Sequence, residues 1–488
     1  MKSGLSRLSL LLVTPCFWLI PLGALTACGG GGGAAGVDAG PPPPVPVTID
    51  VEVATKYQVM VGFGAAAAYF ANYPSIHPSS AAIYQTIFND LGLQVLRIGN
   101  WFQNNNDNGA SLNATVTLVK GAQAALGYTP LLLMSSWNPE ISLKSNGVND
   151  AGGTLIKTAS GGYDYADFGQ WWSQSLAAYA TAGVMPDYIS IQNEPNFSTT
   201  NEGTCLFDPT EDATNAGYGA ALDAVKTAIA AASPPLTKVP KMVGPEVDGL
   251  ANNRLTSYVN GITATGQLGE LDAIAHHLYN GGTAALPNSF DAALSSAAQV
   301  AGSLPTWMTE YAPNNPDMFD TAALIQNSVT VEGVSTYLYW DLFWPAAPVG
   351  SPPEGLVSIE SPSDPSTWRS PNGFFINDSY YAIQHFAKWI GVGWQRVGAT
   401  ASVGSVGVSA FLSPDGTQLT VVLVNTDGVD HPITITAGGA DGGPPAFGTT
   451  AVYRTSGTAE RANPLGPLPA EGGFDFPAQA IATVTFGP

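Results

Sequence analysis

Two glutamates stand out because each one ends an apolar run that reads as a buried strand. Glu194 follows Ile-Gln-Asn at 191–193, and Glu310 follows Trp-Met-Thr at 307–309. Cleavage of a glycosidic bond needs two opposed carboxyl groups. One protonates the leaving oxygen, and the other attacks the sugar carbon or activates water. The alternative for each glutamate taken alone is a solvated carboxylate on a loop. A fold that brings the two together would favour the catalytic interpretation.

The segment from about 47 to 393 alternates strand-like apolar runs with helical patterns. Eight strand-then-helix units in succession predict an α/β fold, a (β/α)8 TIM barrel. A doubly wound sheet is the rival, but no Gly-rich phosphate loop follows an early strand to support it. The predicted strands are 59–63, 95–98, 130–134, 188–191, 241–244, 273–277, 306–309 and 336–340. The predicted helices lie near 80–91, 113–126, 165–183, 214–232, 250–262, 290–302, 319–332 and 379–389. Strands four and seven lie nearly opposite each other in such a ring, so Glu194 and Glu310 could face one another across its mouth.

The pattern changes after residue 393. Residues 403–412, 418–425, 431–437, 449–454 and 480–486 alternate or cluster apolar side chains, with Gly, Pro and Asp between them. This is typical of a β-sandwich, which we predict over 394–488 as a side domain. Residues 47–58 precede the barrel and contain a further strand, 48–53, which we expect to join the sandwich.

The N-terminus is typical of an export signal. Lys2 and Arg7 precede an apolar stretch at 8–25, and Leu-Thr-Ala-Cys at 25–28 resembles a bacterial lipobox. We therefore expect a lipoprotein signal peptide over 1–27, a lipidated Cys28 and a Gly/Pro-rich linker over 28–46. An ordinary signal cut near Ala27 is the alternative. The expected location is the bacterial cell envelope, with the lipid anchor on the outer membrane or cell surface, or secretion.

The composition narrows the possible partners. The 488 residues include 37 acidic and 16 basic side chains, for a net charge of -21, which would repel a phosphate backbone and argues against nucleic acid. A neutral polysaccharide meets no such barrier. Cys16 would leave with the signal peptide and Cys28 would carry lipid, so Cys205 alone would remain and no internal disulfide is expected. No His, Cys and carboxylate cluster has metal-ligand spacing, and we predict no metal, no cofactor and a monomer.

The chain resembles glycoside hydrolase family 30, whose members are retaining (β/α)8 enzymes with catalytic glutamates on strands four and seven. The resemblance runs from about residue 48 to the C-terminus and rests on the order and spacing of several short motifs. The matching segments are Gly-Phe-Gly-Ala at 62–65, Arg97, the segment 135–146, Ile-Gln-Asn-Glu-Pro at 191–195, His-Leu-Tyr at 277–279, 307–310 and the helix 380–386. The chain departs from the family pattern at Glu140, at Ser142 and at Gly-Val-Gly, 391–393.

The resemblance implies roles for the matched residues. Glu310 would be the nucleophile and Glu194 the acid/base, with their carboxyl groups about 5–5.5 Å apart. Asn193 would bind the sugar 2-hydroxyl. Arg97 would orient Glu310, although a structural ion pair is an equal alternative. His277 and Tyr279 would border the nucleophile, and a buried, satisfied histidine is the alternative for His277.

Four further residues lie at predicted strand ends. Trp137 and Trp340 could stack on sugar rings, with core packing as the usual alternative. Glu246 and Asp341 also sit at strand ends, and we interpret them as acidic residues outside the catalytic pair.

The leading functional hypothesis is an endo-acting hydrolase of β-1,4-xylan, similar to a glucuronoxylanase. No arginine follows Trp340 before Arg369, so strict dependence on glucuronic acid side chains is not expected. The alternatives in the family are β-1,6-galactanase, β-1,6-glucanase, glucosylceramidase and xylosidase. A surface lipoprotein that binds glycans without cleaving them is the alternative of another class, and a purely structural lipoprotein is a third.

Overall fold

The computed structural model describes residues 44–103, 109–315, 317–438, 449–457, 459–469 and 473–487. The predicted signal peptide (1–27), Cys28 and most of the predicted linker (28–46) lie outside these residues. None of the described helices is long and apolar enough to span a membrane.

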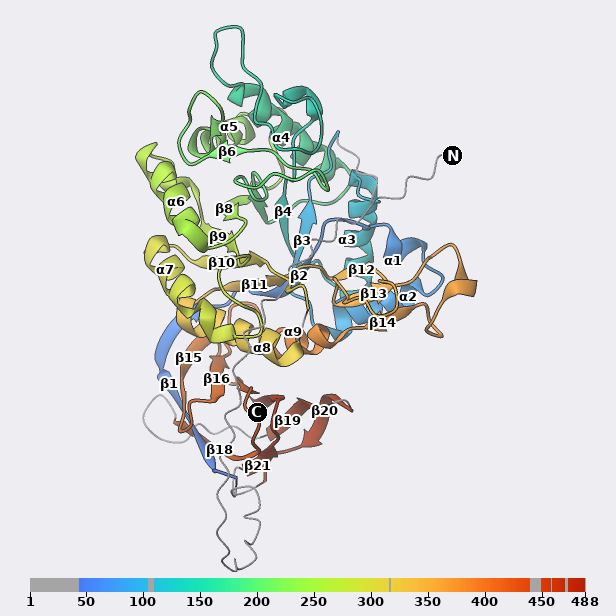
Figure 1. The fold of residues 1–488 in the computed structure, drawn as a ribbon, viewed down its shortest axis with the longest axis vertical. Helices are drawn as coiled ribbons and strands as arrows, with labels where there is room; N and C mark the ends of the chain where they lie inside the picture. Colours follow the sequence, from blue (N-terminus) through green and yellow to red (C-terminus); the bar gives the residue numbers. More distant parts are fainter. Residues whose placement is uncertain are drawn as a thin grey trace, which may run out of the picture. The chain divides into compact units, whose positions relative to one another are not determined.

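Eight parallel strands close into a barrel, as the sequence predicts. Their order around the ring is β10-β11-β2-β3-β4-β5-β8-β9, and Figure 1 shows the helices outside them. The strands read as continuous apolar runs because helices cover the outside of the barrel and side chains fill its inside. The bounds are β2 Gly62–Ala67, β3 Val95–Gly99, β4 Leu131–Ser135, β5 Tyr188–Ser190, β8 Lys241–Val247, β9 Ala273–His277, β10 Thr306–Glu310 and β11 Thr336–Tyr339.

The first barrel strand begins later than the sequence pattern suggests. We expected it at 59–63, but β1 (Val47–Val59) runs through Val59, and β2 begins at Gly62. The small residues of β2 fit its close approach to β3. A Cβ atom on Gly64 would lie only 1.8 Å from the Val95 carbonyl oxygen. The chain therefore turns from one sheet into the other at residues 60–61.

Helices follow the barrel strands and bury their apolar faces against them. Ser111 caps the first long helix by accepting a hydrogen bond from the Ala114 N–H, and Gly127 ends it at a φ of 77°. The helix expected at 80–91 is α-helical only at its start and continues as a π-helix. The bounds are α1 Tyr73–Ile76, α2 Ser80–Tyr84, η1 Gln85–Asp90, α3 Leu112–Leu126, α4 Tyr165–Thr181, α5 Tyr218–Ala230, α6 Arg254–Ala264, α7 Asp291–Ala301, α8 Met318–Asn327 and α9 Asp378–Ala387.

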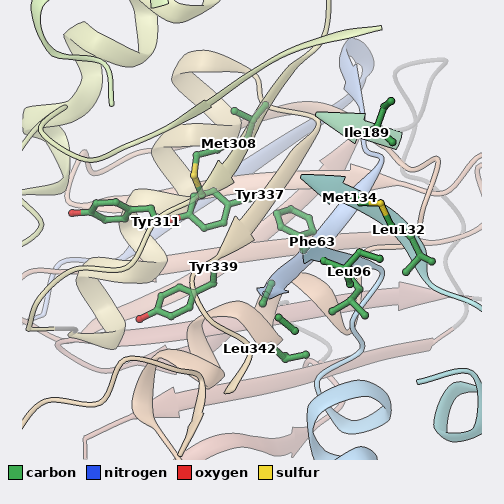
Figure 2. Packing of buried hydrophobic residues seen from close by; sticks show 14 of the residues in the cluster. Phe63, Leu96, Leu132, Met134, Ile189, Met308, Tyr311, Tyr337, Tyr339 and Leu342 are labelled. Atoms are coloured by element: carbon green, nitrogen blue, oxygen red, sulfur yellow. The ribbon is translucent and has the colours of Figure 1, made fainter. Parts of the chain in front are cut away.

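The main core lies between the barrel strands and these helices. A smaller cluster fills the inside of the barrel, and another is formed by side chains of the nine-stranded sheet described below. Figure 2 shows part of the main core, where Phe63, Leu96 and Met134 point outward from neighbouring strands. The next residue along β3 from Leu96 is Arg97, which therefore points into the barrel. This alternation places a cation at the centre of the ring.

The remaining long strands form one nine-stranded sheet in the order β20-β19-β22-β17-β16-β15-β1-β18-β21. The N-terminal strand β1 lies antiparallel to β15 and parallel to β18, so it joins this C-terminal sheet as expected. His385 of α9 fixes the sheet to the barrel through hydrogen bonds of 2.8 Å to Thr455 and Thr483. The bounds are β15 Gln395–Ala401, β16 Val406–Leu412, β17 Leu419–Asn425, β18 His431–Gly438, β19 Thr449–Ser456, β20 Glu460–Gly466, β21 Gly473–Phe476 and β22 Ala480–Gly487.

Two small sheets were not predicted from the sequence. The first, β12-β13-β14, follows the last barrel strand, and the second, β6-β7, follows β5. The backbone N–H of Leu342, just before β12, donates to Ala66 at the end of β2 over 2.7 Å, which fixes this excursion at the barrel mouth. The bounds are β6 Phe207–Asp208, β7 Ala216–Gly217, β12 Phe343–Pro345, β13 Val357–Ile359 and β14 Phe374–Ile376.

Candidate active site

Glu194 and Glu310 lie together at the carboxyl end of the barrel. Glu194 follows β5 and Glu310 ends β10, and their exposed fractions are 7% and 6%. One carboxylate oxygen from each and one ring nitrogen of His277 all lie within 4.8 Å of one another. Two carboxyl groups about 5–5.5 Å apart can act directly on one sugar carbon, whereas a wider pair leaves room for an attacking water. The spacing here fits the closer, retaining arrangement.

Irregular backbone aims these carboxylates into the mouth. The pairing register shifts between Met308 and Glu310, so Glu310 escapes the strict alternation that would turn it outward. Glu194 has a φ of 46° and Glu246, at the end of β8, a φ of 55°, both in the left-handed region that is costly for a residue with a side chain. The Glu194 N–H donates to the Glu246 carbonyl over 3.0 Å, which holds this pair of strained residues.

Arg97 connects the groups at the floor of the site. Its guanidinium is fully buried and lies 2.6 Å from Glu310 Oε2 and 3.1 Å from Glu246 Oε1. It also donates to the Asn193 side-chain oxygen over 2.5 Å. Both interpretations of Arg97 therefore apply, because it orients Glu310 and also forms a buried ion pair with Glu246. Glu246 supports the Glu194 and Glu310 pair from outside it, since its carboxylate holds Arg97 and its carbonyl accepts from the Glu194 N–H.

His277 bridges the two glutamates. Its Nδ1 lies 2.8 Å from Glu194 Oε1 and 3.7 Å from Glu310 Oε1. Burial lowers the pKa of His277 to about 4, so the ring is neutral near neutral pH. The Nδ1 contact with Glu194 is a hydrogen bond, whereas Glu310 lies beyond hydrogen-bond distance. Nε2 has no hydrogen-bond partner among the described residues. The neighbouring His276 points to the outside of the barrel and contacts Glu332.

Glu194 and Glu310 differ in pKa because their surroundings differ. Burial raises the pKa of Glu194 to about 8, and the charge of Asp248 adds to this effect. Burial also raises the pKa of Glu310 to about 7, but the charge of Arg97 opposes the rise. The proton is therefore held more tightly on Glu194, which gives one carboxyl the character of an acid and the other that of an anion.

An open pocket of about 270 Å³ lies over the pair. Tyr279 and Trp340 line it, and both also border an adjoining groove of about 610 Å³. Trp137 does not reach the pocket. It is 1% exposed, stacks on Trp101 and lies under the Arg97 guanidinium, so the core-packing alternative holds for this residue. The pocket lining consists of Glu194, Phe197, Glu202, Asp248, Tyr279, Asn280, Glu310 and Trp340.

Three acidic residues near the pair were not predicted as site residues. Glu202 and Asp248 line the pocket, and Asp341 lies fully buried beside Trp340. Burial raises the pKa of Asp341 well above its usual range, and the charge of Glu310 adds to this effect. Asp341 was expected outside the catalytic pair. Glu202 and Asp248 lie on loops beyond the strand ends, where no local pattern marks them.

Comparisons with known proteins agree with this architecture. The family model described as "Glycosyl hydrolase family 30 beta sandwich domain" matches residues 393–484. An endo-1,6-β-D-glucanase of Aspergillus fumigatus is 25% identical over 354 residues, and the match spans 68% of this chain and only 65% of that protein.

Two solved xylanase structures share the fold. The catalytic domain of the family 30 xylanase C from Talaromyces cellulolyticus superposes with a TM-score of 0.70 at 19% identity, over 90% of this chain and 100% of that one. A family 30 subfamily 8 xylanase from Clostridium acetobutylicum gives a TM-score of 0.63 at 20% identity, over 91% and 100%. The C-terminal sheet therefore matches the sandwich domain of glycoside hydrolase family 30, and the whole described chain shares the fold of two family 30 xylanases.

Proposed function

We propose that the protein is a retaining endo-glycoside hydrolase that cleaves a β-linked polysaccharide by double displacement. The observation that carries this proposal is the approach of Glu194 and Glu310, whose nearest ligand atoms lie within 4.8 Å in an open pocket. Glu310, anchored by Arg97, attacks the anomeric carbon while Glu194 protonates the departing oxygen. Glu194 then takes a proton from water, which releases the sugar from Glu310.

The neighbouring side chains fit supporting roles. Asn193, whose amide oxygen accepts from Arg97, has its amide N–H groups available for a sugar 2-hydroxyl. Tyr279 contributes a hydroxyl close to Glu310, and Trp340 an aromatic surface for a sugar ring. His277 keeps both carboxylates in position. No step in this mechanism calls for a metal.

Two substrates have support. β-1,4-Xylan is the first, because the motif resemblance and two similar folds belong to xylanases. β-1,6-Glucan is the second, because the related sequence from Aspergillus fumigatus is an endo-1,6-β-D-glucanase. The test is reducing-sugar release from glucuronoxylan, linear xylan and β-1,6-glucan by the wild type and by Glu310→Gln. Release by the wild type alone supports the proposal. No release from any β-linked polymer, including β-1,6-galactan, contradicts it.

The pKa shifts predict a bell-shaped dependence of kcat/KM on pH. Glu310 must be ionised, and its pKa of about 7 means that activity is lost as pH falls through that value. Glu194 must be protonated, and its pKa of about 8 means that activity is lost as pH rises through that value. The maximum should therefore lie near neutral pH. Initial rates at low substrate from about pH 5 to about pH 10 measure it. A constant kcat/KM across the basic range would exclude Glu194 as the acid.

We also propose that the protein is exported and anchored through a lipid on Cys28. The lipobox-like Leu-Thr-Ala-Cys at 25–28 and the Gly/Pro-rich stretch that follows support this. Expression in a Gram-negative bacterium should place the wild type in the membrane fraction. Cys28→Ala should move it out of that fraction, because a lipid chain supplies the membrane affinity. A wild type that is already soluble after export would contradict the anchor.

A further inference from the structure

Glu202 is a third carboxylate in the pocket, and the mechanism above does not use it. It lines the same cavity as Glu194 and Glu310 and comes from the loop that follows β5. Burial raises the pKa of Glu202 to about 7, and the charge of Glu194 adds to the rise. A carboxyl group kept in such a position without a catalytic role calls for another explanation.

The loop that carries Glu202 is fixed by contacts with the segment that follows Trp137. Gly203 packs so closely that a Cβ atom there would lie 2.1 Å from the Asn138 side-chain oxygen. The next residue, Thr204, accepts a hydrogen bond from the buried Lys144 ammonium and donates its N–H to Asn149 over 3.0 Å. Glu202 is therefore held at the pocket by the surrounding chain, and its position does not depend on a solvated loop.

Two buried polar groups lie around Glu202 with hydrogen-bonding capacity to spare. The Tyr69 hydroxyl, on a residue only 2% exposed, is near enough to lower the pKa of Glu202 but has no well-aligned partner. Neither carboxyl oxygen of Asp341, on a residue 1% exposed, has a partner among the described residues. The Tyr69 hydroxyl lies within electrostatic range of both acids. Buried polar groups are normally paired. These two lie behind the pocket lining, and Glu202 is the group beside them that faces the pocket.

The charges along the two cavities restrict that ligand. All the charged side chains that line the pocket are acidic, and Glu354 is the charged side chain among those that line the adjoining groove. The cations near the pocket are already paired, Arg97 with Glu246 and Glu310 and Arg254 with Asp248. A carboxylated sugar would meet like charges without a free counter-ion, whereas an uncharged sugar would not.

We propose that Glu202 is a substrate-binding residue that hydrogen-bonds hydroxyl groups of an uncharged sugar held beside Glu194 and Glu310. The acidic lining of the pocket favours neutral glycans over glycans that carry a glucuronate at this position. This inference rests on the proposed glycoside hydrolase function and names the substrate class of the same site.

The test compares Glu202→Ala, Glu202→Gln and the control Glu140→Gln, which removes the same charge at a residue that lines neither cavity. The substrates are linear xylan, β-1,6-glucan and glucuronoxylan. On the neutral polymer that the wild type cleaves best, Glu202→Ala should lose about tenfold to a hundredfold in kcat/KM, the usual cost of an unmet hydrogen bond to a charged group. Glu202→Gln should stay within about threefold because its amide also donates and accepts. Glu140→Gln should match the wild type.

The outcomes separate this inference from the proposed function. An active wild type whose Glu202→Ala variant keeps its kcat/KM, or a wild type that cleaves only glucuronoxylan, overturns the inference alone. A wild type that cleaves none of the polymers overturns the proposed function as well. Thermal unfolding of each variant shows whether it folds. If Glu202→Ala does not fold, Glu202→Asp, which withdraws the carboxyl by one carbon, should show a loss in kcat/KM of the same order.

Discussion

Replacing Glu310 with Gln should lower kcat by a factor on the order of 10⁴ or more, while the protein folds and binds its polysaccharide. The amide has nearly the shape of the carboxylate but cannot form the glycosyl-enzyme bond. Folding should survive because the buried Arg97 keeps Glu246 as a counter-ion at 3.1 Å. Initial rates measure the loss, and calorimetric titration of the variant with an oligosaccharide measures the binding. The same substitution at Glu140 should leave both quantities unchanged.

Chemical rescue can identify the role of Glu310 more directly. In Glu310→Ala, azide can occupy the space of the missing carboxylate and attack the anomeric carbon from the same side. The leaving oxygen takes its proton from Glu194, so the product from a β-linked substrate is an α-glycosyl azide. Recovery of activity with that product, identified by NMR, supports Glu310 as the nucleophile. Full activity of Glu310→Gln without azide would contradict the assignment, and attention would move to Glu202, which lines the same pocket.

The barrel could be predicted from the sequence because buried parallel strands read as apolar runs, and the residues that follow them gather at one end. Strands β9 and β10 begin at the predicted residues, and His277 points inward by simple alternation from Ala273 and Ala275. The first strand could not be placed, because Val59 extends β1 and the Gly/Ala-rich β2 carries little hydrophobic signal. Small residues there reflect close backbone packing, which depends on the partner strand.

The finer geometry of the site depends on contacts that no local pattern reports. A register shift turns Glu310 inward, and left-handed backbone at Glu194 and Glu246 lets their side chains meet His277 and Arg97, respectively. Neither feature follows from alternation of apolar residues. The position of Glu202 could not be predicted from the sequence either. It depends on the buried Lys144, which joins two loops distant in sequence. The sequence allowed Trp137 either to stack on a sugar ring or to pack in the core, and its burial in the structure favours core packing.

Glu194 should be tested by its dependence on the leaving group. Glu194→Ala should lower kcat/KM on polysaccharide by about 10²–10⁴-fold, the usual contribution of a general acid, since an alcohol leaves poorly without a proton. An aryl glycoside whose phenol leaves without protonation should still transfer its sugar to Glu310. The intermediate should then accumulate, because no base activates water, and stopped-flow absorbance should show a burst of phenol followed by slow turnover.

Azide rescue of Glu194→Ala distinguishes the role of Glu194 from that of Glu310. With Glu194 truncated, azide enters from the acid/base side and attacks the sugar bound to Glu310, so the product is a β-glycosyl azide. This is the opposite configuration to that expected for Glu310→Ala. The contrast depends on the two carboxylates acting on opposite faces of the sugar, as double displacement requires. A variant whose losses are equal for good and poor leaving groups, without burst or rescue, would show that Glu194 acts on structure and not on proton transfer.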